Sequence, residues 1–198
     1  MTQFVLASAS GVRANLLSGA AVDFEVVAAA IDEQSYRVRW LRDDGEPAAL
    51  APALAREKAV AVAALRPRQH ILGCDQVLLL DTEPIGKCST KTEARALLAR
   101  LRGRTHELVT AAALVVDNHL LWEHTEICRL TMRNFSDAFL DAYVSMAGDA
   151  LTCCVGCYRL ESCGIQLFER VEGDFFSILG LPLLPVLGEL RRLGLAQS

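Results

Sequence analysis

The chain has 198 residues, which is the size of one ordinary globular domain. Apolar residues make up 52% and charged residues 22%, and no apolar run reaches the roughly 18–20 residues that a membrane-spanning helix needs, so the composition argues against a membrane protein. The net charge of −4 argues against a broad nucleic-acid-binding face, which needs clustered cations. Because Met1–Gln3 carries no basic residue, we expect no signal peptide and a cytoplasmic protein.

The sequence predicts strands where apolar runs end in turn residues, and helices where apolar positions recur at helical spacing. In chain order these are a strand over 4–7, a helix over 12–17, a strand over 24–28, helices over 32–40 and 48–65, strands over 70–80 and 84–86, a helix over 92–101, a hairpin of 108–116 with 120–132, a helix over 136–145, a strand over 164–171 and a helix over 183–193. Because strands and helices are intermixed and one hairpin is antiparallel, we expect a mixed α/β (α+β) fold in a single domain over 1–198.

The first turn, Ser8–Gly11, joins a predicted strand to a predicted helix. Its backbone N–H groups and the positive end of the helix dipole predict an anion site. Arg13, in the first helical turn, adds a guanidinium that suits a phosphate. The segment matches no Walker A sequence and no Gly-x-Gly-x-x-Gly fingerprint, so an ordinary strand-to-helix turn remains an alternative.

Asp75 is the most informative single residue, because it interrupts the apolar strand predicted over 70–80. A buried carboxylate is costly unless it is hydrogen-bonded, paired or bound to a metal. Burial also raises its pKa toward the range of a general base. A structural role at a strand end is the alternative. We favour catalysis, because the neighbouring motifs supply groups that would bind a substrate.

Several other polar residues have two interpretations each. Lys58 and Lys87 have small neighbours and would hold phosphates, or would simply be solvated. Glu33 would bind Mg²⁺ or position water, or would only complement the dipole of the helix that begins there. His106 would carry protons, although a structural role is the commoner one for such a histidine and is the one we favour.

Four of the seven cysteines crowd into one segment, namely Cys153, Cys154, Cys157 and Cys163. A zinc site needs a second ligand pair, and Cys163 alone does not provide one. We therefore expect reduced thiols that pack as small buried side chains.

Taken together, these motifs resemble those of the Maf family of nucleoside triphosphate pyrophosphatases, from about Phe4 to Leu190. The matching segments are Leu6–Ser10, Asp32–Glu33, Glu57–Ala59, Asp75, Gly86–Lys87, Gly103–His106, Glu172–Asp174 and Gly180–Leu183. The resemblance implies an elongated mixed sheet flanked by helices, with a central cleft between two lobes as in ITPase-like proteins, and often a homodimer. It implies hydrolysis of a nucleoside triphosphate to the monophosphate and pyrophosphate, with Mg²⁺ or another divalent cation such as Mn²⁺.

The resemblance also implies roles for individual residues. Asp75 corresponds to the general base, and Glu33 and Asp75 are the candidates for metal contact. The residues that would bind the substrate are Ser8, Arg13, Lys58, Gln76, Lys87 and Glu161. Water would attack the α-phosphorus while the cations hold the departing pyrophosphate.

The pair Asp75–Gln76 with the later Glu161 is similar to the family branch that prefers 7-methyl-GTP. A carboxylate there suits guanine, because it accepts hydrogen bonds from N1–H and from the exocyclic amine. Val12, Cys88 and the segment 153–157 depart from the family pattern and leave the choice of base open. A nucleotide-binding regulator of cell division and septum formation is the alternative to a house-cleaning enzyme, and a metal-binding module built on the cysteines is a third possibility.

Overall fold

The computed structural model describes residues 4–197. Residues 1–3 and 198 lie outside the described residues. The expectation of no signal peptide depends on Met1–Gln3 and therefore falls outside them too. Within residues 4–197 there is no helix that is long and apolar enough to cross a membrane.

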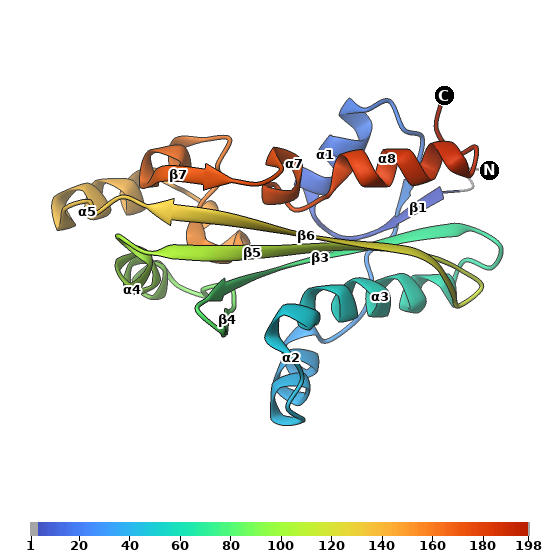
Figure 1. Cartoon of the computed structure of the whole chain (residues 1–198), viewed down its shortest axis with the longest axis horizontal. Helices are drawn as coiled ribbons and strands as arrows, with labels where there is room; N and C mark the ends of the chain where they lie inside the picture. The colour runs from blue at the N-terminus through green and yellow to red at the C-terminus, as the bar shows by residue number, and fades with distance from the viewer. Residues whose placement is uncertain (1–3, 198) are drawn as a thin grey trace. The chain divides into compact units, whose positions relative to one another are not determined.

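The described chain forms a mixed sheet of seven strands flanked by helices, which confirms the predicted α/β class (Figure 1). The strands are β1 (Phe4–Ala7), β2 (Glu25–Val26), β3 (His70–Leu80), β4 (Glu83–Ile85), β5 (Thr105–Val116), β6 (His119–Met132) and β7 (Phe168–Glu172). The helices are α1 (Gly11–Gly19), α2 (Glu33–Arg42), α3 (Leu50–Ala63), α4 (Lys91–Leu101), α5 (Asp137–Met146), α6 (Ala150–Cys153), α7 (Phe175–Ile178) and α8 (Leu183–Arg192), with short 3₁₀ turns η1 (Pro47–Ala49), η2 (Val155–Cys157) and η3 (Cys163–Leu167).

The strand order in the sheet is β2-β1-β3-β5-β6-β7, and β4 pairs with β3 off this path. β1 pairs in parallel with β2 and β3, whereas β4 and β7 pair antiparallel to β3 and β6. The chain divides into two compact units, the first formed by residues up to 76 with 110–126 and 174 onward, and the second by 77–109 and 127–173. The single domain expected over 1–198 stays a prediction.

The first unit buries both faces of β1. Phe4 and Leu6 of β1 pack with α1 and α8, while Val5 and Ala7 pack with α3 on the opposite face (Figure 1). The two sets alternate because successive side chains of a strand point to opposite faces. A strand that is covered on both faces is apolar throughout, as β1 is.

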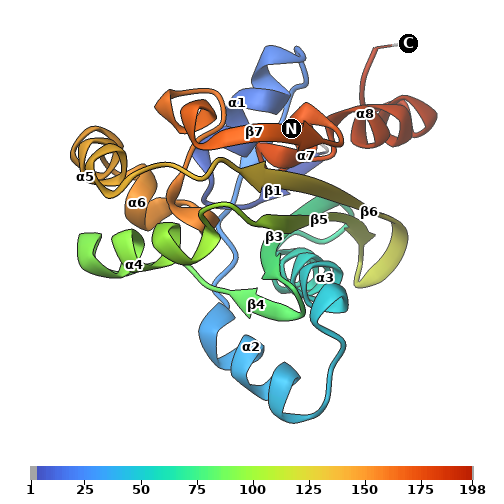
Figure 2. The ribbon, with the colours of Figure 1, turned by 60° about the vertical axis from the view of Figure 1, so that its left-hand side comes forward.

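The second unit is built around helix α4. The apolar residues that recur at helical spacing in the helix predicted over 92–101 are buried, namely Ala94, Leu97, Leu98 and Leu101. Helices α5 and α6 lie beside α4 (Figure 2). Ser136 caps α5 by accepting a hydrogen bond from the backbone N–H of Phe139, so the predicted start of that helix is confirmed.

Two predicted strands are wrong in part. The segment predicted over 24–28 forms only the two residues of β2, and the first half of the segment predicted over 164–171 is the 3₁₀ turn η3. Gly164 explains the second error, because a Cβ there would lie 2.4 Å from the backbone oxygen of Arg159. The backbone at Gly164 comes close to the backbone at Arg159. The apolar residues of the segment, on which the predicted strand was based, do not indicate this close approach.

Candidate active site

The first unit places α3 directly on β3 at Gly73. A Cβ on Gly73 would lie 2.0 Å from the backbone oxygen of Ala55 and 2.8 Å from the backbone nitrogen of Ala59. Only glycine allows this approach. Asp75 follows two residues later on the same face of β3, and Lys58 precedes Ala59 on α3. The glycine therefore brings an acid and a cation from distant parts of the sequence to one place.

Lys58 lies between two carboxylates. Its Nζ is 2.5 Å from Oδ1 of Asp75 and 2.8 Å from Oε1 of Glu33. Lys58 and Asp75 are both buried, whereas about half of the Glu33 side chain (52%) is exposed. In the structure the ammonium of Lys58 thus contacts carboxylates. Its predicted contact with a phosphate stays a prediction.

Glu33 is held in place by the start of α2. Asp32 caps this helix by accepting hydrogen bonds from the backbone N–H and the hydroxyl of Ser35. The helix predicted over 32–40 therefore begins as expected, and Glu33 lies in its first turn, where a carboxylate also complements the helix dipole. The position of Glu33 fits the dipole interpretation, and its predicted contact with a metal ion or water stays a prediction.

Burial raises the pKa of the Asp75 carboxyl, and the nearby charges of Lys58 and Arg13 oppose that rise. Burial makes this carboxylate a stronger base than an exposed aspartate. The nearby cations favour its ionised form, which is the form that can accept a proton. Among the predicted residues of the first unit, Asp75 has the strongest physical case for chemistry.

Arg13 is buried at the start of α1 and binds three oxygens. Its Nε donates to the backbone oxygen of Gly180 at 2.7 Å, and one terminal nitrogen donates to Cys74 O at 2.9 Å and to Ser8 Oγ at 3.2 Å. The other terminal nitrogen, Nη2, has no hydrogen-bond partner within residues 4–197. This atom is not buried, so it reaches solvent. Two N–H groups of a fixed guanidinium therefore remain for an anion.

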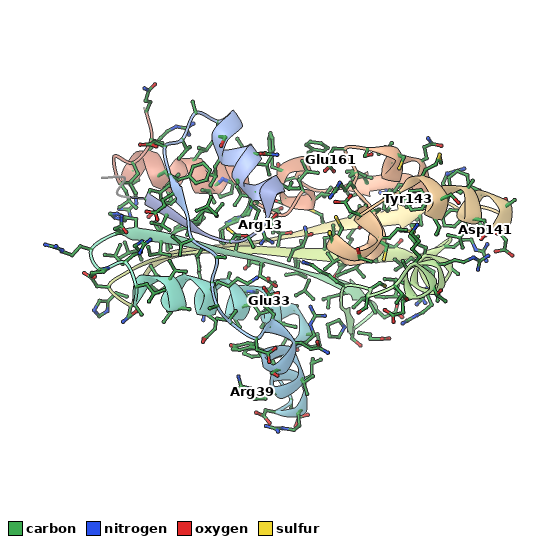
Figure 3. The ribbon with its side chains drawn as sticks, turned by 180° about the vertical axis from the view of Figure 1, so that it is seen from behind. Arg13, Glu33, Arg39, Asp141, Tyr143 and Glu161 are labelled. Atoms are coloured by element: carbon green, nitrogen blue, oxygen red, sulfur yellow. The ribbon has the colours of Figure 1, made fainter. Side chains whose placement is uncertain are left out.

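The loop before α1 is a helix start with a side-chain cap. Ser10 Oγ accepts from the backbone N–H of Arg13, and Ser8 Oγ accepts from the backbone N–H of Ser10. Figure 3 labels Arg13, which α1 contributes to this unit, and Glu33, which α2 contributes. The groups of the predicted anion site, namely a helix N-terminus, a hydroxyl and a guanidinium, are present in this unit, and binding of an anion there stays a prediction.

Lys87 and Glu161 belong to the second unit. Lys87 is exposed in the loop between β4 and α4, where it lines a shallow pocket of about 360 Å³ with Gly86 and Arg100. Glu161 is exposed in the turn before η3. The structure brings together Ser8, Arg13, Glu33, Lys58, Asp75 and Gln76 within the first unit. The contacts of Lys87 and Glu161 with a substrate stay predictions.

The cysteines are free thiols, and only part of the expectation for them holds. Of the four clustered cysteines, Cys157 is buried and Cys153 is exposed, so the prediction that they are all small buried side chains is wrong. The Sγ of Cys157 lies 3.5 Å from that of Cys88. In the described part of the chain, no group of three His, Cys, Asp or Glu side chains is arranged to hold a metal ion.

His106 is a structural residue of the second unit, as favoured from the sequence. Its ring is buried, Nε2 shares a hydrogen bond with the hydroxyl of Tyr158 at 2.7 Å, and the ring packs against Phe168. Burial lowers the pKa of His106 to about 4. The folded protein therefore keeps this imidazole neutral at pH values where an unfolded chain would protonate it.

We expect His106 to make the folded state less stable in mild acid. Below its ordinary pKa of 6.5 the unfolded chain binds a proton that the folded chain does not, so stability present above pH 6.5 is lost as the pH falls toward 4. The loss should reach about 3 kcal/mol in the free energy of unfolding, since a tenfold difference in proton affinity is worth about 1.4 kcal/mol. Urea denaturation at pH 7.5 and pH 4.5 measures it. The His106→Gln variant should lose less stability than the parent, the exposed His119→Gln variant should behave like the parent, and equal losses in all three would contradict the assignment.

The fold and this site define a class of protein. It is an α/β protein in which a buried carboxylate–lysine pair lies in the same unit as a capped, arginine-bearing helix start, and such a combination suits chemistry on an anionic substrate. The family model described as Maf-like protein matches residues 3–193, so the chain belongs to the Maf family.

Relatives in this family are similar over nearly their whole length. A protein of Paramagnetospirillum magneticum named nucleoside triphosphate pyrophosphatase is 45% identical over 96% of this chain and 98% of its own. One of Caulobacter vibrioides with the same name is 44% identical over 96% of each chain. A protein of Mesorhizobium japonicum named 7-methyl-GTP pyrophosphatase is 44% identical over 97% of this chain and 96% of its own. A solved HAM1 protein from Coxiella burnetii aligns with 68% of this chain and 75% of its own at 18% identity and a TM-score of 0.47.

Proposed function

We propose that this protein is a nucleoside triphosphate pyrophosphatase that removes modified or non-canonical nucleotides, with 7-methyl-GTP as the favoured substrate. The observation that carries the proposal is the buried pair of Asp75 and Lys58 in a chain of the Maf family. Relatives named for both activities, on nucleoside triphosphates in general and on 7-methyl-GTP, support it. The sequence pair Asp75–Gln76 with Glu161 supports the choice of a guanine-type base.

In the proposed reaction Asp75 acts on water. Its carboxylate takes a proton from a water molecule while the water oxygen forms a bond to the α-phosphorus, and the bond from that phosphorus to the bridging oxygen breaks. Pyrophosphate leaves with the electron pair of the broken bond. Arg13 offers the two N–H groups of Nη2 to the phosphates, where they stabilise the charge that develops. The Ser8 hydroxyl, the α1 N-terminus, Lys58 and Lys87 are the further groups proposed to bind the phosphates.

Glu33 and Asp75 are the residues proposed to hold Mg²⁺ or Mn²⁺. Two carboxylates suit Mg²⁺, which proteins commonly bind through one or two carboxylates together with substrate phosphates. In the structure both carboxylates contact the Lys58 ammonium, so a metal ion held by both would take the place of this ammonium. When bound, the metal neutralises charge on the phosphates.

We propose a cytoplasmic homodimer that acts on a free nucleotide and not on nucleic acid or a membrane. The acidic composition supports the exclusion of nucleic acid. The mass of the protein in solution, measured by light scattering, tests the homodimer.

Pyrophosphate release from a panel of nucleotides tests the proposed function. With Mg²⁺ present we expect kcat/KM for 7-methyl-GTP to exceed the values for dTTP and UTP by about tenfold or more, a ratio that one well-placed polar contact supplies. Removal of Mg²⁺ with EDTA should abolish release. A preference for either pyrimidine would overturn the interpretation of Gln76 and Glu161. If no nucleotide in a broad panel released pyrophosphate, the septation regulator would become the better hypothesis.

A further inference from the structure

The side-chain amide of Gln76 is fixed in one orientation. Its Nε2 lies 2.8 Å from Oγ1 of Thr110, 2.9 Å from the backbone oxygen of Ser177 and 3.1 Å from that of Ile178. Backbone oxygens only accept hydrogen bonds, so the NH₂ group must face them and the amide oxygen must face away. The chemistry of its neighbours therefore settles the orientation that is usually ambiguous for a glutamine.

Thr110 is the one side chain in this arrangement, and its hydroxyl is also committed. The hydroxyl donates to the backbone oxygen of Ser177 at 2.8 Å, and Thr110 is fully buried on β5. Because its only proton is used there, Oγ1 can offer Gln76 lone pairs and no donor. Thr110 thus matches the NH₂ end of Gln76 and excludes the oxygen end.

The backbone that receives these bonds is held by a helix cap. Asp174 caps α7, and its Oδ2 accepts from the backbone N–H of Ser177 at 2.7 Å and from its hydroxyl at 2.8 Å. Ser177 is buried as well. Gln76, Thr110 and Asp174 come from three separate segments of the first unit, so this network joins all three.

The oxygen end of Gln76 is open. Oε1 has no hydrogen-bond partner among residues 4–197. This atom is not buried, so it is accessible to solvent. With the NH₂ group fully used, Gln76 can only accept a hydrogen bond from a ligand. A glutamine that was free to rotate would instead satisfy donors and acceptors equally.

We propose that Thr110 is a positioning residue that acts with the backbone oxygens of Ser177 and Ile178 to make Gln76 an acceptor-only contact, and that the site thereby selects a base whose facing edge donates hydrogen bonds. This inference rests on the proposed function, in which Gln76 contacts the base. Guanine-type bases offer two adjacent donors, N1–H and the 2-amino group, and 7-methylguanine keeps both. Adenine has an acceptor at the same ring nitrogen, which would face the oxygen of Gln76. Uracil and thymine offer one N–H between two carbonyl acceptors.

Binding of uncleavable nucleotides to the full-length protein tests the proposal without relying on catalysis. The probes are the α,β-methylene analogues of GTP and ATP, whose affinities are measured by calorimetry in the presence of Mg²⁺. We expect the parent protein to prefer the guanine analogue. Thr110→Val, which keeps the shape and removes the hydroxyl, should reduce that preference by about 5- to 10-fold, the loss of roughly one hydrogen bond. Thr110→Ser, which keeps the hydroxyl, should restore it.

Two controls separate positioning from mere stability. Thr105→Val, an exposed threonine on the same strand, should leave the preference unchanged, and thermal unfolding of each variant shows whether it is folded. In turnover of GTP, Thr110→Val should raise KM with little change in kcat. Equal preferences in the parent, Thr110→Val and Thr110→Ser proteins would overturn the inference even if pyrophosphate is released. A parent protein that shows the Thr110-dependent preference without releasing pyrophosphate would overturn the enzyme proposal alone, and one that binds neither analogue would overturn the inference.

Discussion

Asp75→Asn should lower kcat for pyrophosphate release by about 10³-fold and change nucleotide affinity by less than about threefold. Asparagine has the shape of aspartate and cannot take a proton from water. Lys58 keeps its contact with Glu33, so the variant does not leave this buried ammonium without a carboxylate. Steady-state release of pyrophosphate from 7-methyl-GTP gives kcat, and calorimetry with an uncleavable analogue gives the affinity.

Asp81→Asn provides the matched control. Asp81 lies six positions further along the chain, is exposed, and has a positive φ of 57°, which asparagine also tolerates. Its kcat should equal that of the parent. Because burial raises the pKa of Asp75 and only the ionised form is a base, parent activity should fall with decreasing pH at a higher pH than an ordinary aspartate would cause. An Asp75→Asn protein that is as active as Asp81→Asn would remove Asp75 from the mechanism.

Gly73→Ala should lower the free energy of unfolding by about 3 kcal/mol. The new methyl group would collide with backbone atoms of Ala55 and Ala59, which cannot move without shifting α3 from β3. Urea denaturation at neutral pH measures the loss. Since the same contact brings Lys58 to Asp75, the folded fraction of this variant should also release pyrophosphate more slowly.

Gly188→Ala tests whether the loss belongs to the site of the glycine rather than to the substitution. Gly188 is exposed in α8, and a Cβ there meets nothing within 4 Å. Alanine should therefore raise the stability by about 0.5–1 kcal/mol, because it lowers the entropy of the unfolded chain and favours the helix. If Gly73→Ala were as stable as the parent, the account of how α3 is placed on β3 would be wrong.

The positions of the helices and strands could be predicted from the sequence better than the contacts between them. The bounds of β3 and the buried face of α4 are as predicted, because each depends on a local run or spacing of apolar residues. The partner of Asp75 is different. Its pairing with Lys58 depends on Gly73 meeting α3, a contact between segments that no local pattern encodes.

The polar network around Gln76 shows the same limit. Thr110 is an ordinary residue for a β-strand, so nothing in its neighbourhood marks it. The cap at Asp174 was within reach of the sequence, since aspartate is a preferred N-cap residue and α7 begins directly after it. Even so, the motif Glu172–Asp174 gave no indication that the following backbone would hold Gln76.

Hydrolysis in ¹⁸O-labelled water tests the central claim, that water activated at Asp75 attacks the α-phosphorus. The protein is incubated with 7-methyl-GTP and Mg²⁺, and mass spectrometry locates the label in the products. We predict one labelled oxygen in 7-methyl-GMP, none in pyrophosphate, and labelled product formed about 10³-fold more slowly by Asp75→Asn. Label in pyrophosphate, or labelled monophosphate formed equally fast by the variant, would contradict the account.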